Sequence, residues 1–559
     1  MQKFQDLPYK RPDPKVALAI LKESKKMLKK AKSPEDAQAA YLKLNEIASE
    51  LLSMKAIATI RSMLDMNDEF YASELRYRSL KSIHVQLHLA FTVKAFAKSK
   101  HRGAIEERFG PQTFIYREAM LKWGGLKAAK ETKIENELVT KYRKLMASFK
   151  VELNGEQYGF YDLLKRVQSI NREERQVAFH AFAGFHADNA KELDGIYDQL
   201  LKVRVKKAKK FGFDKYIDYA YASKRREYTP KETANFRESV KKHIVPLYAQ
   251  IAETQRQRHG LETLTFFDET VFYPDGNPQL LGEYDDVIAA TGKMFEGLSP
   301  ETGEFFKFMT DYNLIDLEAR PGKQLGGFCN MILEYKAPYI FGNFNGTSDD
   351  VFMITHEAGH AFQAYLASRK QELAEYYAST SEINEIHAMA MEFFPYPWME
   401  LYFGEDAEKY RVMRIAKRLY SILYHVCVDE FQEEVYNNPT MTADQRRQVW
   451  KTIENKYVPW CNYDGNEYFA SGGSWMIHQH IVLYPFYIIE YALSQICAYQ
   501  YYARSLENSE AAWADYMKLC AAGGSKGYFE LLKEGNLENP LEDKTVEETA
   551  AKVKAILKM

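Results

Sequence analysis

The clearest chemical pattern in the chain is a pair of histidines with a glutamate, in the segment His356-Glu-Ala-Gly-His360. If this segment is helical, the spacing of four residues places both imidazoles on one helix face, where they can bind a single Zn²⁺. Glu357 lies about 100° round the helix from His356 and can act on a water molecule at the metal. The pattern therefore predicts a zinc site with Glu357 as a general base.

The histidine pair needs a third protein ligand, because a catalytic zinc site has three ligands and one open position. The pattern alone arises by chance in roughly two of a hundred chains of this length. Leu366 and Thr380 occupy the positions at which metzincins and thermolysin-like enzymes carry their third ligand. Further along, Glu385 and Glu392 are seven residues apart and share one helix face, with Glu382 near it. We expect one of these glutamates to bind the metal and another to orient a ligand histidine.

The elements that position these residues are mostly helices. Residues 347–350 offer candidate helix caps, and residues 351–369 follow as one helix that contains the histidine pair. Residues 326–346 are rich in Phe, Tyr and Ile and predict short strands of a small sheet. From about residue 13 to 320, apolar residues recur at the spacing of amphipathic helices. We therefore expect a mainly α protein with a small β-sheet next to the zinc-binding helix.

A second group of polar side chains lies near the C-terminus. His480, Tyr484, Tyr487 and Tyr491 recur at the spacing of one continuous helix stripe. Taken alone, such a stripe is more often part of a core. Facing a zinc site, it would supply donors for an oxyanion and for a peptide backbone. His478 competes with His480 for this role, although it points elsewhere on a helix.

Composition excludes several classes of function. Lys+Arg 75 and Asp+Glu 77 give a net charge of −2, so the chain lacks the basic excess of a nucleic-acid-binding protein. The best candidate for a membrane span, residues 481–489, contains Pro485 and is well short of the ~20 apolar residues required. The N-terminal residues show no secretory signal, and the five cysteines form no C-x-x-C pair. We expect a soluble, cytoplasmic protein with no nucleic-acid or membrane partner.

These residues resemble the thimet oligopeptidase and oligoendopeptidase F family of zinc peptidases, and the bacterial oligoendopeptidase F and Pz-peptidase branch most closely. The resemblance rests on the histidine motif, the twenty-four residues that separate it from Glu385, the strand-like segment before it, and Gly472-Gly473 ahead of His480. It implies one Zn²⁺ per chain. The implied ligands are His356, His360 and Glu385, with Glu357 as the general base and with Glu392 and Asp350 as carboxylates behind the ligands.

The resemblance also assigns roles to the C-terminal stripe and to the strand segment. His480, Tyr484 and Tyr491 are expected to stabilise the oxyanion by hydrogen bonding. The strand around residues 339–345 is expected to pair with the substrate as an additional strand. The expected substrate contacts are Tyr339, Gly342, Asn343 and Tyr487.

A fold and a function follow from the same resemblance. It implies two helical lobes around a deep substrate channel, with residues 1–200 as the N-terminal lobe and residues 201–559 as the catalytic lobe. A narrow channel admits only short, unfolded peptides. The implied function is therefore a zinc-dependent oligoendopeptidase that cuts internal bonds of such peptides.

Two alternatives stay open. A zinc aminopeptidase would need a carboxylate that recognises the free substrate amine, and Glu382 could provide it. A helical peptide-binding protein with a structural zinc would need the ligands but no base, so the intact Glu357 favours catalysis. Co²⁺ and Mn²⁺ occupy similar sites, and the sequence leaves the oligomeric state and any role of the cysteines open.

Overall fold

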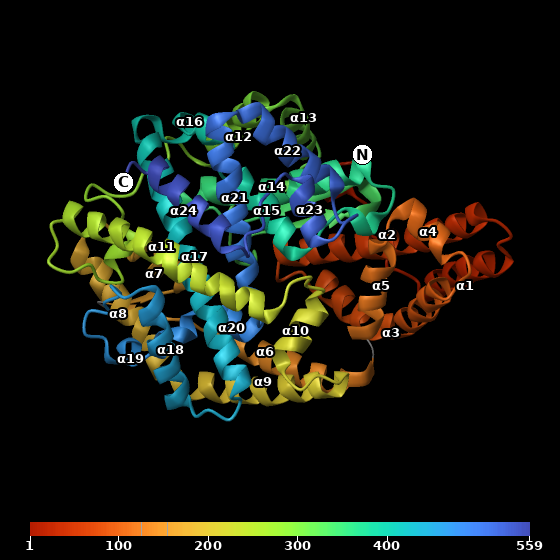
Figure 1. The fold of residues 1–559 in the computed structure, drawn as a ribbon, viewed down its shortest axis with the longest axis horizontal. Helices are drawn as coiled ribbons and strands as arrows, with labels where there is room; N and C mark the ends of the chain where they lie inside the picture. The colour runs from red at the N-terminus through yellow and green to blue at the C-terminus, as the bar shows by residue number, and fades with distance from the viewer. Residues whose placement is uncertain (124–125, 154) are drawn as a thin grey trace. The chain divides into compact units, whose positions relative to one another are not determined.

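Helices make up most of the chain, as the amphipathic spacing predicts, and the sheets are small (Figure 1). The structure is a computed structural model that describes residues 1–123, 126–153 and 155–559. Its elements form two compact units, each built from three separate segments of the chain. The first unit contains Met1–Gly124, Gln279–Ala407 and Cys497–Glu538, and the second contains Gly125–Pro278, Glu408–Ile496 and Asn539–Met559.

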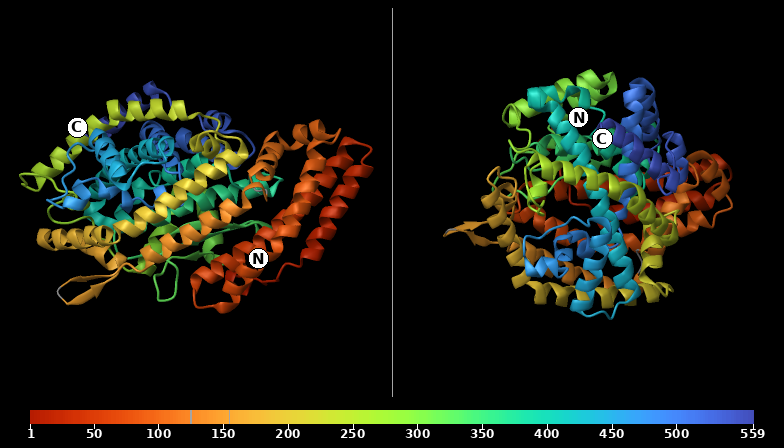
Figure 2. Two further views of the ribbon diagram at one scale, coloured as in Figure 1. Left: turned by 90° about the horizontal axis from the view of Figure 1, so that it is seen from below. Right: turned by 60° about the vertical axis from the view of Figure 1, so that its left-hand side comes forward.

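The first unit begins with helices α1 (Pro14–Lys30), α2 (Pro34–Leu64), α3 (Glu69–Ala97), α4 (Arg102–Phe109) and α5 (Gln112–Trp123). The first three lie side by side and share an apolar core (Figure 2). Helix α2 begins at a reciprocal capping box between Ser33 and Asp36, with Pro34 at its first position. Local sequence signals therefore set where this long helix starts.

The middle segment of the first unit carries a sheet of three strands, β3 (Ile315–Asp316), β4 (Phe328–Ile332) and β5 (Ala337–Phe341). Strand β5 is central, parallel to β3 and antiparallel to β4, and every one of its residues is buried. Helices α14 (Asp349–Lys370) and α15 (Ser381–Met391) follow, and α14 contacts both β4 and β5. The prediction of a small sheet next to the helix with the histidine pair is confirmed.

The other helices of the first unit are α12 (Tyr284–Leu298), α13 (Pro300–Asp311), α16 (Glu400–Phe403), α22 (Ser509–Ala522) and α23 (Tyr528–Glu534). Two helices belong partly to each unit, α17 (Ala407–Asn437) and α21 (Ile489–Glu507). Short 3₁₀ turns are found at η1 (Phe4–Asp6), η2 (Leu126–Ala128), η3 (Asp268–Thr270), η4 (Leu333–Tyr335), η5 (Ala374–Tyr376), η6 (Tyr396–Trp398), η7 (Gly404–Asp406) and η8 (Gly473–Ile477).

The second unit is also helical. It contains an antiparallel hairpin of β1 (Val151–Leu153) and β2 (Glu156–Tyr158), which Figure 2 shows as a narrow ribbon. Its helices are α6 (Ala129–Ala147), α7 (Phe160–Arg166), α8 (Arg172–Asp188), α9 (Ala190–Phe211), α10 (Tyr216–Lys224), α11 (Pro230–Arg258), α18 (Ala443–Tyr457), α19 (Glu467–Ala470), α20 (Gln479–Leu483) and α24 (Asp543–Ile556).

The division expected at residue 200 falls inside α9. The compact units do not follow it, because each of them gathers segments that are far apart in the chain. A helical lobe before residue 200 and a catalytic lobe after it therefore stay a prediction. Within the described residues, no helix has an apolar stretch long enough to cross a membrane.

Glu269 and Glu454 are buried carboxyl groups of the second unit. Burial raises the pKa of Glu269 and of Glu454 to about 7. Glu454 Oε1 accepts a hydrogen bond from the hydroxyl of Tyr463 at 2.6 Å, a bond that favours the charged form and only partly offsets the burial. Each carboxyl therefore favours the folded chain most when it is protonated.

We predict that Glu454 lowers the thermal stability of the protein as the pH rises from 5 to 8. The pKa of Glu454 is about 7 when folded and about 4.3 in an unfolded chain, so its contribution is complete below about pH 4.3 and is lost as the pH rises through about 7. Glu454→Gln should show a smaller decrease in Tm over this range by calorimetry. The exposed Glu467→Gln serves as the control and should follow the wild type. Equal pH dependence of Tm in all three proteins would contradict the prediction.

Candidate active site

Helix α14 presents the two histidines of the motif toward α15. His356 Nε2 lies 3.6 Å from Glu385 Oε2, and His360 Nε2 lies 3.7 Å from the same oxygen. A ligand atom of each of these three residues lies within 4.8 Å of the other two. A tetrahedral zinc with bonds of ~2.1 Å keeps its ligand atoms roughly 3.4 Å apart. The donor set and its spacing therefore fit Zn²⁺, and the three predicted ligands come together.

A second carboxylate fixes the orientation of the first ligand. His356 Nδ1 and Glu392 Oε1 are 2.7 Å apart, so the Nδ1–H donates to Glu392 and the Nε2 lone pair is left for the metal. Burial opposes a charge on His356, but the hydrogen bond to Glu392 and the negative charges of the nearby glutamates together outweigh it and raise the pKa of that imidazole. Burial lowers the pKa of His360 well below its ordinary value, so this ligand is neutral and ready to bind.

Glu357 is buried and lies close to an exposed glycine. Its Oε2 has no hydrogen-bond partner among the described residues, and burial raises its pKa. Gly327 is exposed, and a Cβ placed there would lie 3.5 Å from Glu357 Oε1. Exposed backbone at Gly327 therefore lies next to the carboxylate. The pair Gly326-Gly327 just before β4 is the sequence feature that indicates this position, and the prediction from sequence did not use it.

Gly359, inside the motif, sets the distance between α14 and α15. A Cβ at Gly359 would lie 2.6 Å from Ala388 Cα, 2.7 Å from His387 O and 2.9 Å from Met391 Cβ. Two of these atoms belong to the backbone and cannot move aside as a flexible side chain would. Only glycine lets α15 approach closely enough for Glu385 to meet the histidines. The prediction from sequence missed this role. A glycine in the interior of a helix, such as Gly359 in α14, indicates close packing against a neighbouring element.

Asp350 supports the loop that leads to α14. Its Oδ1 accepts a hydrogen bond from Asn345 N at 3.0 Å, and its Oδ2 accepts one from Gly346 N at 2.8 Å. Burial raises the pKa of Asp350 to about 6, although these bonds favour the charged form. The carboxylate thus organises the start of the helix, and its bonds go to this loop and not to the ligand histidines.

The prediction that the strand around residues 339–345 pairs with the substrate is wrong. Strand β5 is hydrogen-bonded on both edges, with Ile340 N donating to Leu314 O on the β3 side and Tyr339 opposite Asn330 on β4. Tyr339 is buried, and its ring centroid lies 4.4 Å from that of Phe4. A central, covered strand cannot accept a further strand, so Tyr339 is a core residue.

Gly342 and Asn343 contact other parts of the protein. A Cβ at Gly342 would lie 2.6 Å from atoms of both Leu317 and Met353, so this glycine permits close packing. Asn343 Nδ2 donates to the carbonyl oxygens of Gln324 and Gly326, both at 2.9 Å. Gly342 is therefore a packing position, and the amide of Asn343 holds the loop that precedes β4.

Strand β4, and not β5, has an unpaired edge in the described sheet. Ile340 directs its backbone N–H toward β3, so its neighbours in β5, Tyr339 and Phe341, direct theirs toward β4. Their partners in β4 are Asn330 and Phe328. In an antiparallel pair the intervening residues direct their N–H and C=O groups away from the partner. Cys329 and Met331 therefore direct their backbone groups outward, along an edge that begins beside Gly327 and Glu357.

The C-terminal stripe is not one continuous helix. His480 is in α20, Tyr484 follows its end, and Pro485 and Phe486 interrupt the backbone, with Phe486 at φ 58°. A proline removes a backbone donor and disfavours helix in the residue before it, which explains the break. The continuous helix expected over residues 480–491 is therefore wrong.

The side chains of the stripe nevertheless gather around one imidazole. The ring centroid of His480 lies 6.0 Å from that of Tyr491, 6.1 Å from that of Tyr484 and 6.3 Å from that of Tyr487. Burial lowers the pKa of His480. Tyr484 is 48% exposed, and its hydroxyl accepts a hydrogen bond from Arg143 at 3.2 Å. The second unit thus brings together the four residues that the sequence groups.

His478 has a different environment. Its ring centroid lies 5.1 Å from that of Tyr424 and 5.0 Å from that of Trp450, and burial lowers its pKa to about 3. Gly472 before it approaches α18 closely, since a Cβ there would lie 2.0 Å from Arg447 O. Gly472 therefore lets this segment pack against α18, and Gly473 lets it pack against Tyr468 of α19. These contacts favour His480 over His478 as the group that meets a substrate.

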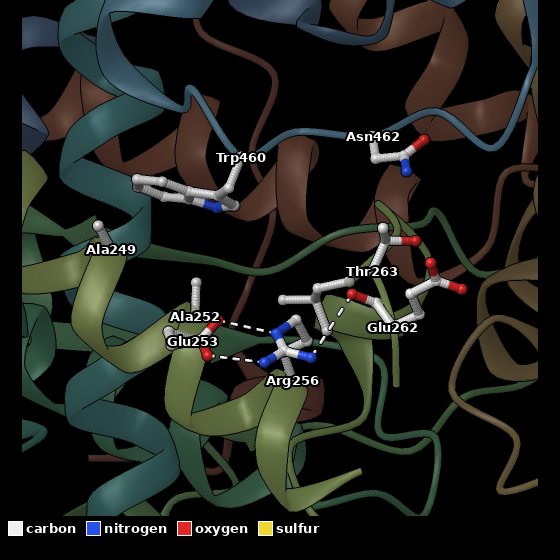
Figure 3. Close-up of a pocket in the computed structure, with 9 residues that line it drawn as sticks. Ala249, Ala252, Glu253, Arg256, Glu262, Thr263, Trp460 and Asn462 are labelled. Carbon is white, nitrogen blue, oxygen red and sulfur yellow. Dashed lines mark hydrogen bonds and ion pairs between the residues drawn. The ribbon is translucent and has the colours of Figure 1, made fainter. Parts of the chain in front are cut away.

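A separate pocket of about 270 Å³ is found in the second unit (Figure 3). Two of its charged groups pair with each other, because Arg256 donates to both carboxylate oxygens of Glu253 at 2.8 Å. None of the predicted site residues lines it. The lining residues are Ala249, Ala252, Glu253, Arg256, Glu262, Thr263, Leu264, Trp460 and Asn462. This pocket is not a candidate for the zinc chemistry.

Comparisons with known proteins agree with the site. The model of the peptidase M3 N-terminal domain matches residues 4–123, and that of peptidase family M3 matches residues 303–551. A structure of Pz peptidase A with an inhibitor is 41% identical, with a TM-score of 0.93 over 100% of this chain and 99% of that chain.

Two curated relatives come from Lactococcus lactis. The chromosomal oligoendopeptidase F of subspecies cremoris is 24% identical over 40% of this chain, and an oligoendopeptidase F homolog of subspecies lactis is 21% identical over 68% of it. The matched regions span 35% and 62% of the length of these relatives.

We predict that Gly359→Ala weakens zinc binding by roughly ten- to 100-fold, because the new methyl group pushes α15 and Glu385 away from the histidines. Competition with a chromophoric chelator measures the affinity. Gly292→Ala in α12 is the control, since a Cβ at Gly292 meets only Phe306, at an ordinary contact distance of 3.6 Å. If Gly359→Ala binds zinc as tightly as the control, the close approach of the helices does not set the ligand geometry.

Proposed function

The chain belongs to peptidase family M3, and from this premise we propose that it is a zinc-dependent oligoendopeptidase acting on short, unfolded peptides. The observation that carries the proposal is the joint presence of three ligand side chains and a buried glutamate that borders an exposed glycine. A structural zinc site needs the ligands but no base. The position of Glu357 therefore supports hydrolysis over a binding role.

His356, His360 and Glu385 would hold the metal, whose chemistry when bound is to polarise the scissile carbonyl and to make a neighbouring water more acidic. Glu357 takes a proton from the attacking water and later gives it to the leaving amine. Its carboxylate is suited to both steps because no described side chain donates to Oε2. Glu392 keeps His356 in the tautomer that leaves Nε2 available.

The outer edge of β4 is the proposed path of the substrate. Backbone groups of Cys329 and Met331 face outward there, so an extended peptide could pair with them as a fourth strand. Such pairing uses the peptide backbone and is indifferent to most side chains. The edge begins beside Gly327, so a peptide bound along it would pass close to Glu357.

The donors to the oxyanion are proposed to be His480 and Tyr491, with Tyr484 as a further candidate. All three belong to the cluster around His480, and the burial of that imidazole keeps it neutral. A neutral imidazole can donate from the nitrogen that carries the proton. Tyr487 lies in the same cluster and is assigned to contact with the substrate.

The central test is cleavage of an internally quenched nonapeptide blocked at both ends. Wild-type cleavage should be internal, should stop on chelation and should return with zinc. Glu357→Gln should bind zinc with unchanged affinity but lose nearly all activity, whereas the exposed Glu301→Gln should behave as the wild type. Cleavage of the same peptide with a free N-terminus, but not of the blocked peptide, would point to an exopeptidase. If the wild type and Glu357→Gln both bind zinc and neither cleaves either peptide, only a binding function is left.

A second prediction separates the tyrosines by their kinetic effect. Tyr491→Phe should lower kcat by roughly 100- to 1,000-fold with little change in KM, because it removes a donor that acts on the transition state. Tyr487→Phe should instead raise KM, as expected for a substrate contact. Steady-state kinetics on the quenched peptide distinguish these outcomes. An unchanged kcat in Tyr491→Phe would remove this residue from the mechanism.

A further inference from the structure

The loop of residues 318–327, between β3 and β4, carries an exposed leucine and ends next to the candidate active site. Leu325 is 59% exposed. It precedes Gly327 by two residues, and two residues span at most ~7 Å. A Cβ at Gly327 would lie 3.5 Å from Glu357 Oε1. Leu325 is therefore within the reach of a substrate residue close to the bond that Glu357 attacks.

The backbone around Leu325 is fixed on both sides. The side-chain amide of Asn343 donates to the carbonyls of Gln324 and Gly326, which flank the leucine. Gln324 N also donates to Met63 O at 2.8 Å, at the end of α2. These bonds keep the backbone of the loop from moving to bury Leu325. Its exposure is a property of the folded loop.

A buried lysine holds the rest of this loop. Lys323 is 3% exposed, and its ammonium donates to Asp316 Oδ1 and to the carbonyls of Asp316, Glu318 and Gly342. The carbonyl of Gly342 belongs to the residue that follows β5 and precedes Asn343. One short segment of chain thus fixes the loop twice, through the Gly342 carbonyl and the Asn343 amide.

Exposed apolar side chains also occur where α2 is connected to α3. Met66 N donates to Gly322 O at 2.8 Å, which ties the connection between α2 and α3 to the loop. Met66 is 56% exposed and Phe70 is 53% exposed. Single exposed apolar residues are common on protein surfaces. Leu325 differs because its backbone is pinned and because its loop ends beside the general base.

We propose that Leu325 forms the floor of an apolar subsite that binds a Leu- or Phe-like side chain of the substrate, within two residues of the scissile bond. The proposal rests on the proposed function. The backbone pairing along β4 is indifferent to side chains, so the leucine adds a preference at one substrate position. An apolar side chain that covers Leu325 removes the surfaces of both from water, which favours binding.

The test is a set of blocked, quenched nonapeptides in which each of three positions on either side of the scissile bond carries Leu, Ala or Asp in turn. The wild type should prefer Leu over Ala by roughly ten- to 50-fold in kcat/KM at one position. Leu325→Ser should abolish this preference at that position and leave the others unchanged, whereas Leu325→Met should retain it. Leu325→Arg should favour Asp at the same position. Because that change is a gain of a new preference, partial unfolding cannot imitate it.

Leu281→Ser is the matched control, since Leu281 is 67% exposed in the same unit and its backbone N–H donates to Tyr402 O. Its specificity profile should equal that of the wild type. If the wild type cleaves none of the peptides, the proposed function fails. If it cleaves them and Leu325→Ser keeps the wild-type profile, or loses activity equally at every position, the subsite at Leu325 is overturned.

Discussion

The close approach of α15 to α14 is the constraint on which the active site depends. Two ligands come from one helix and the third from the next, so their geometry is set by the distance between the two helix axes. At Gly359 a single methyl group would lie within 2.6 Å of the backbone of α15. The motif thus contributes more than ligands, because its glycine brings the third ligand into place.

The elements around this contact are fixed by buried polar interactions. Arg117 on α5 pairs with Glu375 at 2.7 Å, and both side chains are nearly inaccessible to solvent. Tyr41 on α2 donates to the same glutamate and accepts from Arg117. Glu375 lies in η5, just before α15, so helices near the N-terminus hold the segment that leads to the third ligand. A buried ion pair of this kind is costly to break and specifies one arrangement of its neighbours.

The sequence was most informative where function depends on local geometry. The histidine spacing predicted the ligand pair because both residues belong to one helix, and the seven-residue interval predicted that Glu385 and Glu392 share a face. The path of the substrate strand was misassigned because the order of the sheet depends on β3, whose two residues give almost no pattern. The break after His480 could have been predicted from Pro485, but the spacing of polar residues was given more weight than the proline. Each compact unit combines segments that are far apart in the chain, and local sequence patterns do not indicate which distant segments pack together.

Three glutamates of the site are chemically identical, and their surroundings give them different tasks. Glu385 lies 3.6 and 3.7 Å from the two imidazole nitrogens, where a cation shared with them is its natural partner. Glu392 accepts the Nδ1–H of His356 and so orients that ligand. Glu357 has one oxygen beyond the reach of any described donor and the other beside an exposed glycine. A carboxylate with no fixed partner can exchange a proton with a bound reactant, whereas one held by a donor cannot do so without breaking that bond. The division of labour among the three therefore arises from hydrogen bonding and packing, and the same surroundings explain why Glu357 is the base.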